Sequence, residues 1–155
     1  MKTLVLFESF FGNTEKVARA IGSALGLTDA DVMRVTELKP GQLEETELLI
    51  VGSPTRAFQA SPDTKVFLSK LASNSLKGKK IAAFDTRAEM TEKTPGFLRF
   101  MAGLFGYAAE PIARKLVSKG GTQILAPAGF IVLNSEGPLK EGELERAAAW
   151  VREIK

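Results

Sequence analysis

Residues 5–18 read Val5-Leu6-Phe7-Glu8-Ser9-Phe10-Phe11-Gly12-Asn13-Thr14-Glu15-Lys16-Val17-Ala18. The apolar run 4–7 predicts a buried strand, and the apolar positions 17, 20, 21 and 24 recur at the spacing of a helix. Between them lies a turn that carries hydroxyls and a glycine. A strand, a tight turn and a helix start aim several backbone N–H groups and the positive end of a helix dipole at one point. The stretch therefore predicts a phosphate site, where Ser9 and Thr14 add hydroxyls and Gly12 permits close backbone approach.

The composition is that of an ordinary globular protein. The chain has 155 residues, of which 45% are apolar and 25% charged, and we expect one domain over residues 1–155. It contains no run of 18 uncharged apolar residues, so we expect no membrane span. Residues 1–3 run directly into the first strand without a leader pattern, which predicts a cytoplasmic location.

Two residue types are absent. The chain has no cysteine and no histidine, which excludes disulfides, thiolate nucleophiles, Cys-ligated metals and His-dependent triads. We therefore expect no metal site, and an organic cofactor is the natural source of any difficult chemistry. The net charge is only +3, and no basic run is interleaved with aromatics, so we expect no nucleic-acid partner.

Strand and helix patterns alternate along the whole chain. Strands are expected at residues 4–7, 31–35, 48–51 and 81–84, with a fifth strand split around Pro127 and Gly129. Helices are expected from residue 15 to about 25, around residues 112–117 and over residues 144–154. The helix around 112–117 has apolar residues at 112, 116 and 117 and ends at the glycines 120–121. A further helix is expected to begin at Ser61 as N-cap, with a buried stripe of Val66, Phe67 and Leu71. This order predicts an α/β fold with a parallel sheet covered on both faces. Ligands then bind at the carboxyl ends of the strands, in loops 8–14, 53–62 and 85 onward.

The connection Thr86–Gly106 is long and apolar. It contains Phe97, Leu98, Phe100, Met101, Leu104 and Phe105. Such a connection is typical of an extra short helix packed on the domain, of a lid over a cofactor, or of a dimer face. Two further aromatic residues have simple interpretations: Trp150 is expected at the surface or an edge, and Tyr107 is expected to pack rather than donate a proton.

The first loop resembles the signature of the flavodoxin family. The residues that satisfy it are Val5, Leu6, Phe7, Ser9, Gly12, Thr14, Ala18 and Ile21. Residues 50–55, Ile-Val-Gly-Ser-Pro-Thr, are similar to the third strand and second flavin loop of that family. The resemblance covers the whole chain and implies a flavodoxin-like three-layer sandwich of the short-chain type. Its five-stranded parallel sheet would have the order 2-1-3-4-5.

The resemblance also implies an FMN site. Around the phosphate it places Ser9, Phe10, Phe11, Gly12, Asn13 and Thr14. On one side of the isoalloxazine ring it places Pro54, Thr55, Arg56, Ala57 and Phe58, with Phe58 as the candidate for stacking. On the other side it places Asp85, Thr86 and Arg87.

Three features depart from the family pattern. Phe11 replaces a hydroxyl of the phosphate loop, the sequence pI is about 9.2 rather than acidic, and the third loop reads Asp85-Thr86-Arg87 without the usual aromatic. The arginines suggest a hypothesis: Arg56 or Arg87 raises the reduction potential of the flavin, which would suit two-electron chemistry with a quinone. The alternative is that both point to solvent or pair with Asp85 or Asp63. Phe10 and Phe11 can equally pack on the protein itself.

The resemblance implies an FMN-binding flavoprotein of electron transport, with a redox partner protein or a quinone-like small molecule as acceptor. Two alternatives stay open. One is an FMN-dependent oxidoreductase of the quinone reductase or protoporphyrinogen oxidase type, and the other is a module with this fold but no tight flavin binding. A triphosphate-binding loop ending in Gly-Lys-Ser/Thr is absent, and so are the acidic residues of a phospho-acceptor receiver domain. The sequence leaves both a monomer and a homodimer open.

Overall fold

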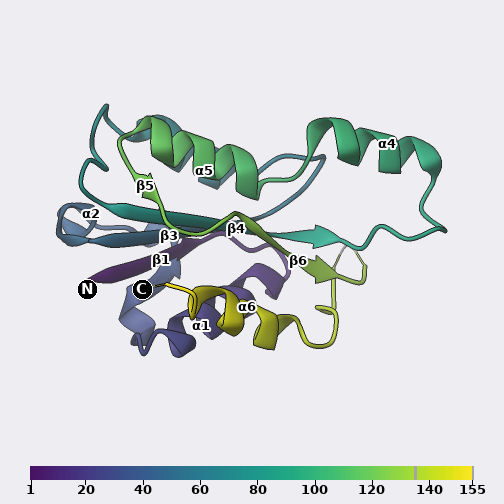
Figure 1. Ribbon diagram of the computed structural model, residues 1–155, viewed down its shortest axis with the longest axis horizontal. Coiled ribbons are helices and arrows are strands. Elements are labelled where there is room, and N and C mark those ends of the chain that lie inside the picture. Colours follow the sequence, from purple (N-terminus) through teal and green to yellow (C-terminus); the bar gives the residue numbers. More distant parts are fainter. Residues whose placement is uncertain (135, 155) are drawn as a thin grey trace.

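A computed structural model describes residues 1–134 and 136–154. These residues form one twisted sheet of six strands with helices on both faces (Figure 1). The strands are β1 (Thr3–Phe7), β2 (Val32–Arg34), β3 (Leu48–Pro54), β4 (Lys80–Ala88), β5 (Thr122–Gln123) and β6 (Ala128–Val132). The helices are α1 (Asn13–Ala24), α2 (Gln42–Glu45), α3 (Pro62–Lys70), α4 (Gly96–Phe105), α5 (Ala109–Ser118) and α6 (Glu143–Val151). Short 3-10 turns, η1 (Asp29–Asp31) and η2 (Val35–Glu37), flank β2, which is shorter than the strand expected over 31–35.

The sheet is parallel throughout and has the order β2-β1-β3-β4-β5, which confirms the predicted topology. The fifth position is divided, as the sequence predicts. The short strand β5 pairs with the start of β4, and β6 pairs with its end, so the sheet has a sixth strand. The division falls at Pro127, which has no N–H to donate to a ladder.

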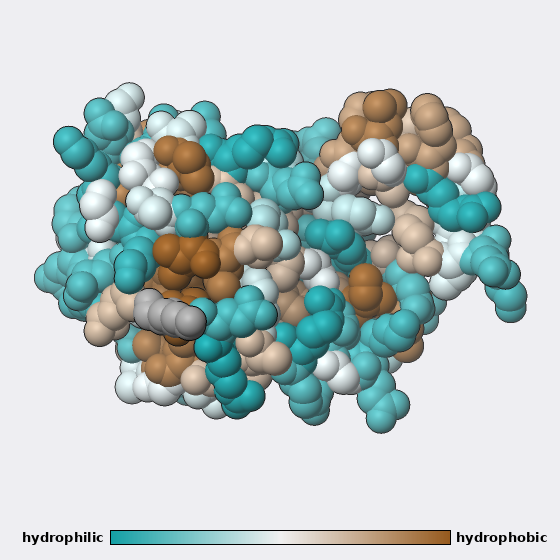
Figure 2. All heavy atoms as spheres, viewed as in Figure 1, coloured by the Kyte–Doolittle hydropathy of each residue, from teal (hydrophilic) through white to brown (hydrophobic). Residues whose placement is uncertain are grey.

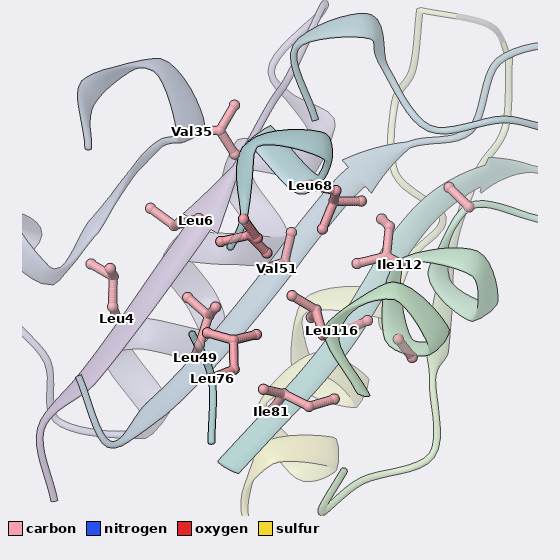
Figure 3. Packing of buried hydrophobic residues seen from close by; sticks show 14 residues of the cluster. Leu4, Leu6, Val35, Leu49, Val51, Leu68, Leu76, Ile81, Ile112 and Leu116 are labelled. Atoms are coloured by element: carbon pink, nitrogen blue, oxygen red, sulfur yellow. The ribbon is translucent and has the colours of Figure 1, made fainter. Parts of the chain in front are cut away.

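Two layers of core lie on the two faces of the sheet. One face packs against α3 and α5, and the labelled side chains of Figure 3 show Leu68, Ile112 and Leu116 meeting the side chains of β1, β3 and β4. The other face packs against α1 and α6, through residues such as Ile21 and Val151. The central strands β1 and β3 are buried on both faces, which explains their unbroken apolar sequences.

The helix α3 begins as predicted. Ser61 is the N-cap, Pro62 occupies the first helical position, and the Ser61 hydroxyl accepts the Thr64 N–H at 3.3 Å. The predicted buried stripe is partly wrong: Val66 is exposed, and Leu68 is buried instead. The helix is rotated so that Thr64 and Leu68 face the sheet. Two other apolar residues of the helices, Val117 of α5 and Leu144 of α6, are also exposed.

Trp150 lies partly buried beside the divided edge strand of the sheet, in keeping with the surface or edge position expected from the sequence. Its ring meets those of Phe84 and Phe130 edge to face, with centroids 6.2 and 6.1 Å away. Its indole N–H donates to the carbonyl of Ala126 at 3.0 Å. The indole thus covers the region between β5 and β6, where β4 lacks a continuous neighbour.

The apolar segment 96–105 forms a short helix, as the first of the three alternatives predicts, but α4 buries little of its surface against the domain. Of its ten residues only Ala102 is buried. Figure 1 shows α4 at the end of the molecule toward which the arrows of β4 and β6 point. None of the helices built from the described residues is long and apolar enough to cross a membrane.

The close contact between β3 and β4 gives a stability prediction. A Cβ added at Gly52 would lie 2.0 Å from the Phe84 ring, so we expect Gly52→Ala to lower the free energy of unfolding by about 2–3 kcal/mol through overpacking. The midpoint of urea unfolding measures this change. A matched control is Gly103→Ala, where a Cβ meets nothing within 4 Å and no loss is expected. Equal stability of Gly52→Ala and the parent protein would contradict the packing described.

Candidate functional site

Three loops meet in a cleft of about 180 Å³ at the carboxyl ends of β1, β3 and β4. Of the residues predicted for the site, the cleft is lined by Ser9, Phe10, Phe11, Asn13, Thr14, Pro54, Thr55, Arg56, Ala57, Thr86 and Arg87. The predicted residues Gly12, Phe58 and Asp85 do not line it. Three lining residues, Ala88, Val132 and Asn134, were not predicted. Two of these come from β6 and the loop after it, whose approach depends on the split of the fifth strand.

The loop after β1 leads directly into α1. Gly12 adopts φ 92°, a left-handed conformation that favours glycine, and serves as the N-cap of α1. Two amides of this loop are already used: the Ser9 N–H donates to Glu8 Oε1 at 3.0 Å, and the Gly12 N–H donates to Ser9 Oγ at 3.0 Å. The loop's donors are therefore fewer than its sequence suggests.

Four further amides of this loop have no partner among the described residues. Within residues 1–134 and 136–154, the amides of Phe10, Phe11, Asn13 and Thr14 donate to no other group. The amides of Asn13 and Thr14 belong to the first turn of α1, where backbone N–H groups lack partners inside the helix. Free amides and the positive end of the helix dipole together make a site suited to an anion.

Hydrogen bonds tie the three loops to one another. The hydroxyls of Thr14 and Thr86 are 2.7 Å apart, which joins the start of α1 to the end of β4. The Thr55 N–H donates to the Thr86 carbonyl at 2.8 Å, and Thr55 Oγ1 accepts the Ala108 N–H at 3.0 Å. Threonine hydroxyls can both donate and accept, so this chain of contacts satisfies buried groups while it fixes the cleft walls.

Glu8 and Arg34 form an ion pair that holds the first loop in place. The sequence analysis did not identify either residue as part of the site. The Glu8 carboxylate is buried and bonds to the Arg34 guanidinium. Arg34 Nη1 also donates to the Ser9 carbonyl at 3.1 Å. The pair depends on the neighbouring positions of β1 and β2 in the sheet, and no local spacing in the sequence connects residues 26 positions apart.

Asp85 lies beneath the cleft rather than in it. Its side chain is fully buried, and Arg87 donates to both of its oxygens at 2.7 Å, while the Ala109 N–H donates to Oδ2 at 2.9 Å. Burial raises the pKa of the Asp85 carboxyl above its usual value, and the bonds from Arg87 and Ala109 partly offset this. Of the two predicted alternatives for Arg87, pairing with Asp85 is therefore confirmed.

The guanidinium of Arg87 is held on two further sides. It lies 3.8 Å from the ring centroid of Tyr107, which confirms the packing role of that tyrosine. A Cβ at Gly129 would fall 2.0 Å from Arg87 Nε, so the absence of a side chain on β6 makes room for the arginine. Arg87 thus presents an ion pair, rather than an uncompensated cation, to the cleft.

Arg56 differs from Arg87 in its partners. Its guanidinium lies 5.0 Å from the ring centroid of Phe10 and 5.5 Å from that of Phe11, and no carboxylate of the described residues pairs with it. Both phenylalanine rings are about half exposed, at 45% and 48%. This contact between the first and second loops spans the mouth of the cleft, and it places an uncompensated positive charge there.

Phe58 lies outside the cleft. Its ring contacts that of Phe105 at the end of α4, with centroids 6.2 Å apart. Phe58 and Ala57 both have positive φ, 64° and 48°, which is uncommon for residues with a side chain. This backbone turn directs the Phe58 ring toward α4 and away from the first loop.

A parallel sheet of this order, with an anion-type loop at its switch point between β1 and β3, defines a doubly wound α/β protein. The chain belongs to the flavodoxin family: the sequence profile described as "Flavodoxin" matches residues 5–150. Proteins of this family bind flavin, typically FMN, and transfer electrons to redox partners. No curated protein sequence matches the chain.

Solved structures agree on the fold. A flavodoxin from the domain Archaea is similar with a TM-score of 0.76 and 24% identity over 99% of this chain and 96% of that one. Oxidised flavodoxin 1 from Bacillus cereus is similar with a TM-score of 0.73 and 20% sequence identity, over 99% of this chain and 96% of that one. A structure described as the flavodoxin, WrbA-like protein from Agrobacterium tumefaciens has a TM-score of 0.69 and 18% sequence identity, over 99% of both chains.

The buried ion pair predicts a pH-dependent stability. In Arg87→Gln the Asp85 carboxylate loses its cation, and we expect the free energy of unfolding at pH 8 to fall by about 3 kcal/mol. Burial raises the folded-state pKa of Asp85, so the folded protein binds a proton more tightly than the unfolded chain. The stability deficit of the variant, which is its loss of unfolding free energy relative to the parent protein, is therefore largest above this pKa. It shrinks as the pH falls and the carboxylate is protonated.

Urea unfolding at a series of pH values measures this deficit. The control is the double variant Arg87→Gln, Asp85→Asn, which removes the buried charge and should recover much of the stability at pH 8. A deficit that is independent of pH, or that the double variant does not relieve, would contradict the role given to the pair.

Proposed function

We propose that this chain binds FMN in the cleft and transfers electrons between the flavin and an external acceptor. The observation that carries the proposal is a set of amides at the N-terminus of α1, those of Phe10, Phe11, Asn13 and Thr14, beside the Thr14 hydroxyl. Across residues 1–134 and 136–154 they donate to no other group. These groups suit a phosphate monoester. FMN, when bound, supplies the one- and two-electron chemistry that the side chains of this chain lack.

The remainder of the cofactor would lie partly inside the cleft and partly outside its open mouth. Residues 54–57 and 86–88 form two facing walls beyond the free amides. A volume of about 180 Å³ is smaller than a typical closed ligand pocket of roughly 300–1,000 Å³, so part of the flavin would remain exposed at the mouth. An exposed edge suits electron transfer to a partner. The stacking role predicted for Phe58 would require its ring to leave Phe105.

The charges around the cleft bear on the potential. Arg87 is neutralised by Asp85, whereas Arg56 is not paired with any described carboxylate. A cation beside the flavin stabilises the negative charge gained on reduction. We therefore assign the hypothesis of a raised potential to Arg56 alone.

A second candidate function is reduction of a planar apolar substrate such as a quinone. The observation that favours it is the exposed apolar helix α4, whose Phe105 contacts Phe58 on the second loop of the site. Turnover of quinones with a nicotinamide donor would distinguish this enzyme from a pure electron carrier.

Cofactor binding is tested by titrating the purified protein with FMN and following the visible spectrum. We expect saturable binding with a shifted flavin band. Thr14→Val keeps the shape of the buried side chain but removes the hydroxyl, and we expect affinity for FMN to fall about tenfold, with little change for riboflavin, which lacks the phosphate. A protein that takes up no FMN would refute the proposal and favour a module without tight flavin binding. Equal losses for both ligands would remove Thr14 from the phosphate site.

The role of Arg56 is tested by a redox titration of the FMN-loaded protein. We expect Arg56→Gln to lower the two-electron midpoint potential by roughly 20–40 mV, since an exposed cation contributes about 1–2 kcal/mol. The matched control is Lys119→Gln, which removes one positive charge at the C-cap of α5, outside the cleft, and should change the potential little. Identical potentials in Arg56→Gln and the parent protein would contradict the hypothesis that Arg56 raises the reduction potential of the flavin.

A further inference from the structure

The helix α4 turns its apolar face to solvent. At about 100° per residue, its large apolar side chains occupy an arc of roughly 160°, and Arg99, Ala102 and the glycines 96 and 103 lie on the opposite side. In an ordinary surface helix such an arc faces the core. Here Phe97 is 70% exposed, Phe100 66% and Leu104 63%, while the one buried residue is Ala102. Figure 2 shows the resulting apolar patch at the position of α4.

The patch is large for a protein that remains free in water. With about 200 Å² for a whole side chain, the exposed fractions of Phe97, Phe100 and Phe105 amount to roughly 400 Å². Leu98 and Leu104 add to this area. The sum reaches the size of the largest patches found on monomers, which are commonly functional. A patch of this area is covered when the protein is at work, either by a partner or by a lipid surface.

The segment of the sequence that contains α4 and the following helix α5 has a net positive charge. The segment from residue 90 to residue 119 carries Lys93, Arg99, Arg114, Lys115 and Lys119 against Glu92 and Glu110. These five cations and two carboxylates give the segment a net charge of +3, which equals the formal net charge of the whole chain. The positive and negative charges of all other residues therefore cancel. The excess positive charge is therefore concentrated in the segment that contains the apolar helix.

We propose that α4 is a membrane-surface helix, which inserts its apolar arc into the interfacial region of an anionic bilayer without crossing it. Phenylalanine and leucine on one side, with basic residues on and beside the helix, are the features that such a surface binds. Arg99 lies on the side opposite the apolar arc, where an interfacial helix keeps its charged residues in contact with water. A helix that stands out from the sheet can enter the interface while the rest of the protein stays in water.

The position of α4 relative to the cleft gives this anchor a consequence. The contact between Phe105 and Phe58 joins the end of α4 to the loop that forms one wall of the cleft. Both lie toward the end of the molecule at which β4 and β6 terminate (Figure 1). Binding through α4 would hold the cleft near the lipid surface, where apolar acceptors dissolve.

Vesicle co-sedimentation with the full chain tests the proposal without any flavin. We expect binding to vesicles of phosphatidylglycerol and phosphatidylcholine in equal parts, with weaker binding to phosphatidylcholine alone and at high salt. The variant Phe97→Ser, Phe100→Ser, Leu104→Ser should lose at least about tenfold in partitioning, because it removes three large apolar side chains from the interface. These side chains are exposed, so circular dichroism and the thermal midpoint should stay close to those of the parent protein.

The matched control is Val66→Ser, Val117→Ser, which removes two exposed apolar side chains from α3 and α5 and should bind vesicles within about twofold of the parent protein. Failure to bind anionic vesicles overturns the proposal, as does binding that the triple variant retains. A third outcome is a protein that does not bind vesicles but forms a concentration-dependent dimer, which the triple variant abolishes. This outcome would show that a second copy covers α4, and it would also overturn the proposal.

Discussion

The parallel register of β1, β3 and β4 is the constraint on which the rest of the structure depends. Because Phe7 pairs with Gly52, and Gly52 with Phe84, the three strands end at the same edge of the sheet. Their following loops must then meet, and the hydrogen bonds through Thr14, Thr86 and Thr55 hold them in place. A cleft with free amides on one wall is the direct product of that register.

Much of this could be predicted from the sequence because the signals are local. The apolar strands, the N-cap at Ser61 and the split at Pro127 each depend on a few neighbouring residues, and all agree with the structure. The strand order and the meeting of the three loops followed from the family resemblance and the rule for parallel sheets. The roles assigned to individual residues in holding FMN remain predictions.

The errors have a common physical cause, which is that side-chain direction depends on tertiary packing. The family resemblance places Asp85 beside the flavin ring, yet its side chain points below the cleft to Arg87 and to the Ala109 N–H. Val66 of α3 is apolar but exposed, because the helix turns Thr64 and Leu68 toward the sheet instead. The apolar content of α4 predicted a helix correctly, but the sequence contains nothing that distinguishes an arc facing the core from one facing solvent.

The division of the fifth strand has a consequence for association between sheets. One margin of the sheet is the three-residue strand β2, and the other is made of two short pieces that Pro127 separates. Neither margin offers a long row of unpaired N–H and C=O groups on which a strand of another molecule could add. The protein can therefore expose an apolar helix without also presenting a template for edge-to-edge growth into fibrils.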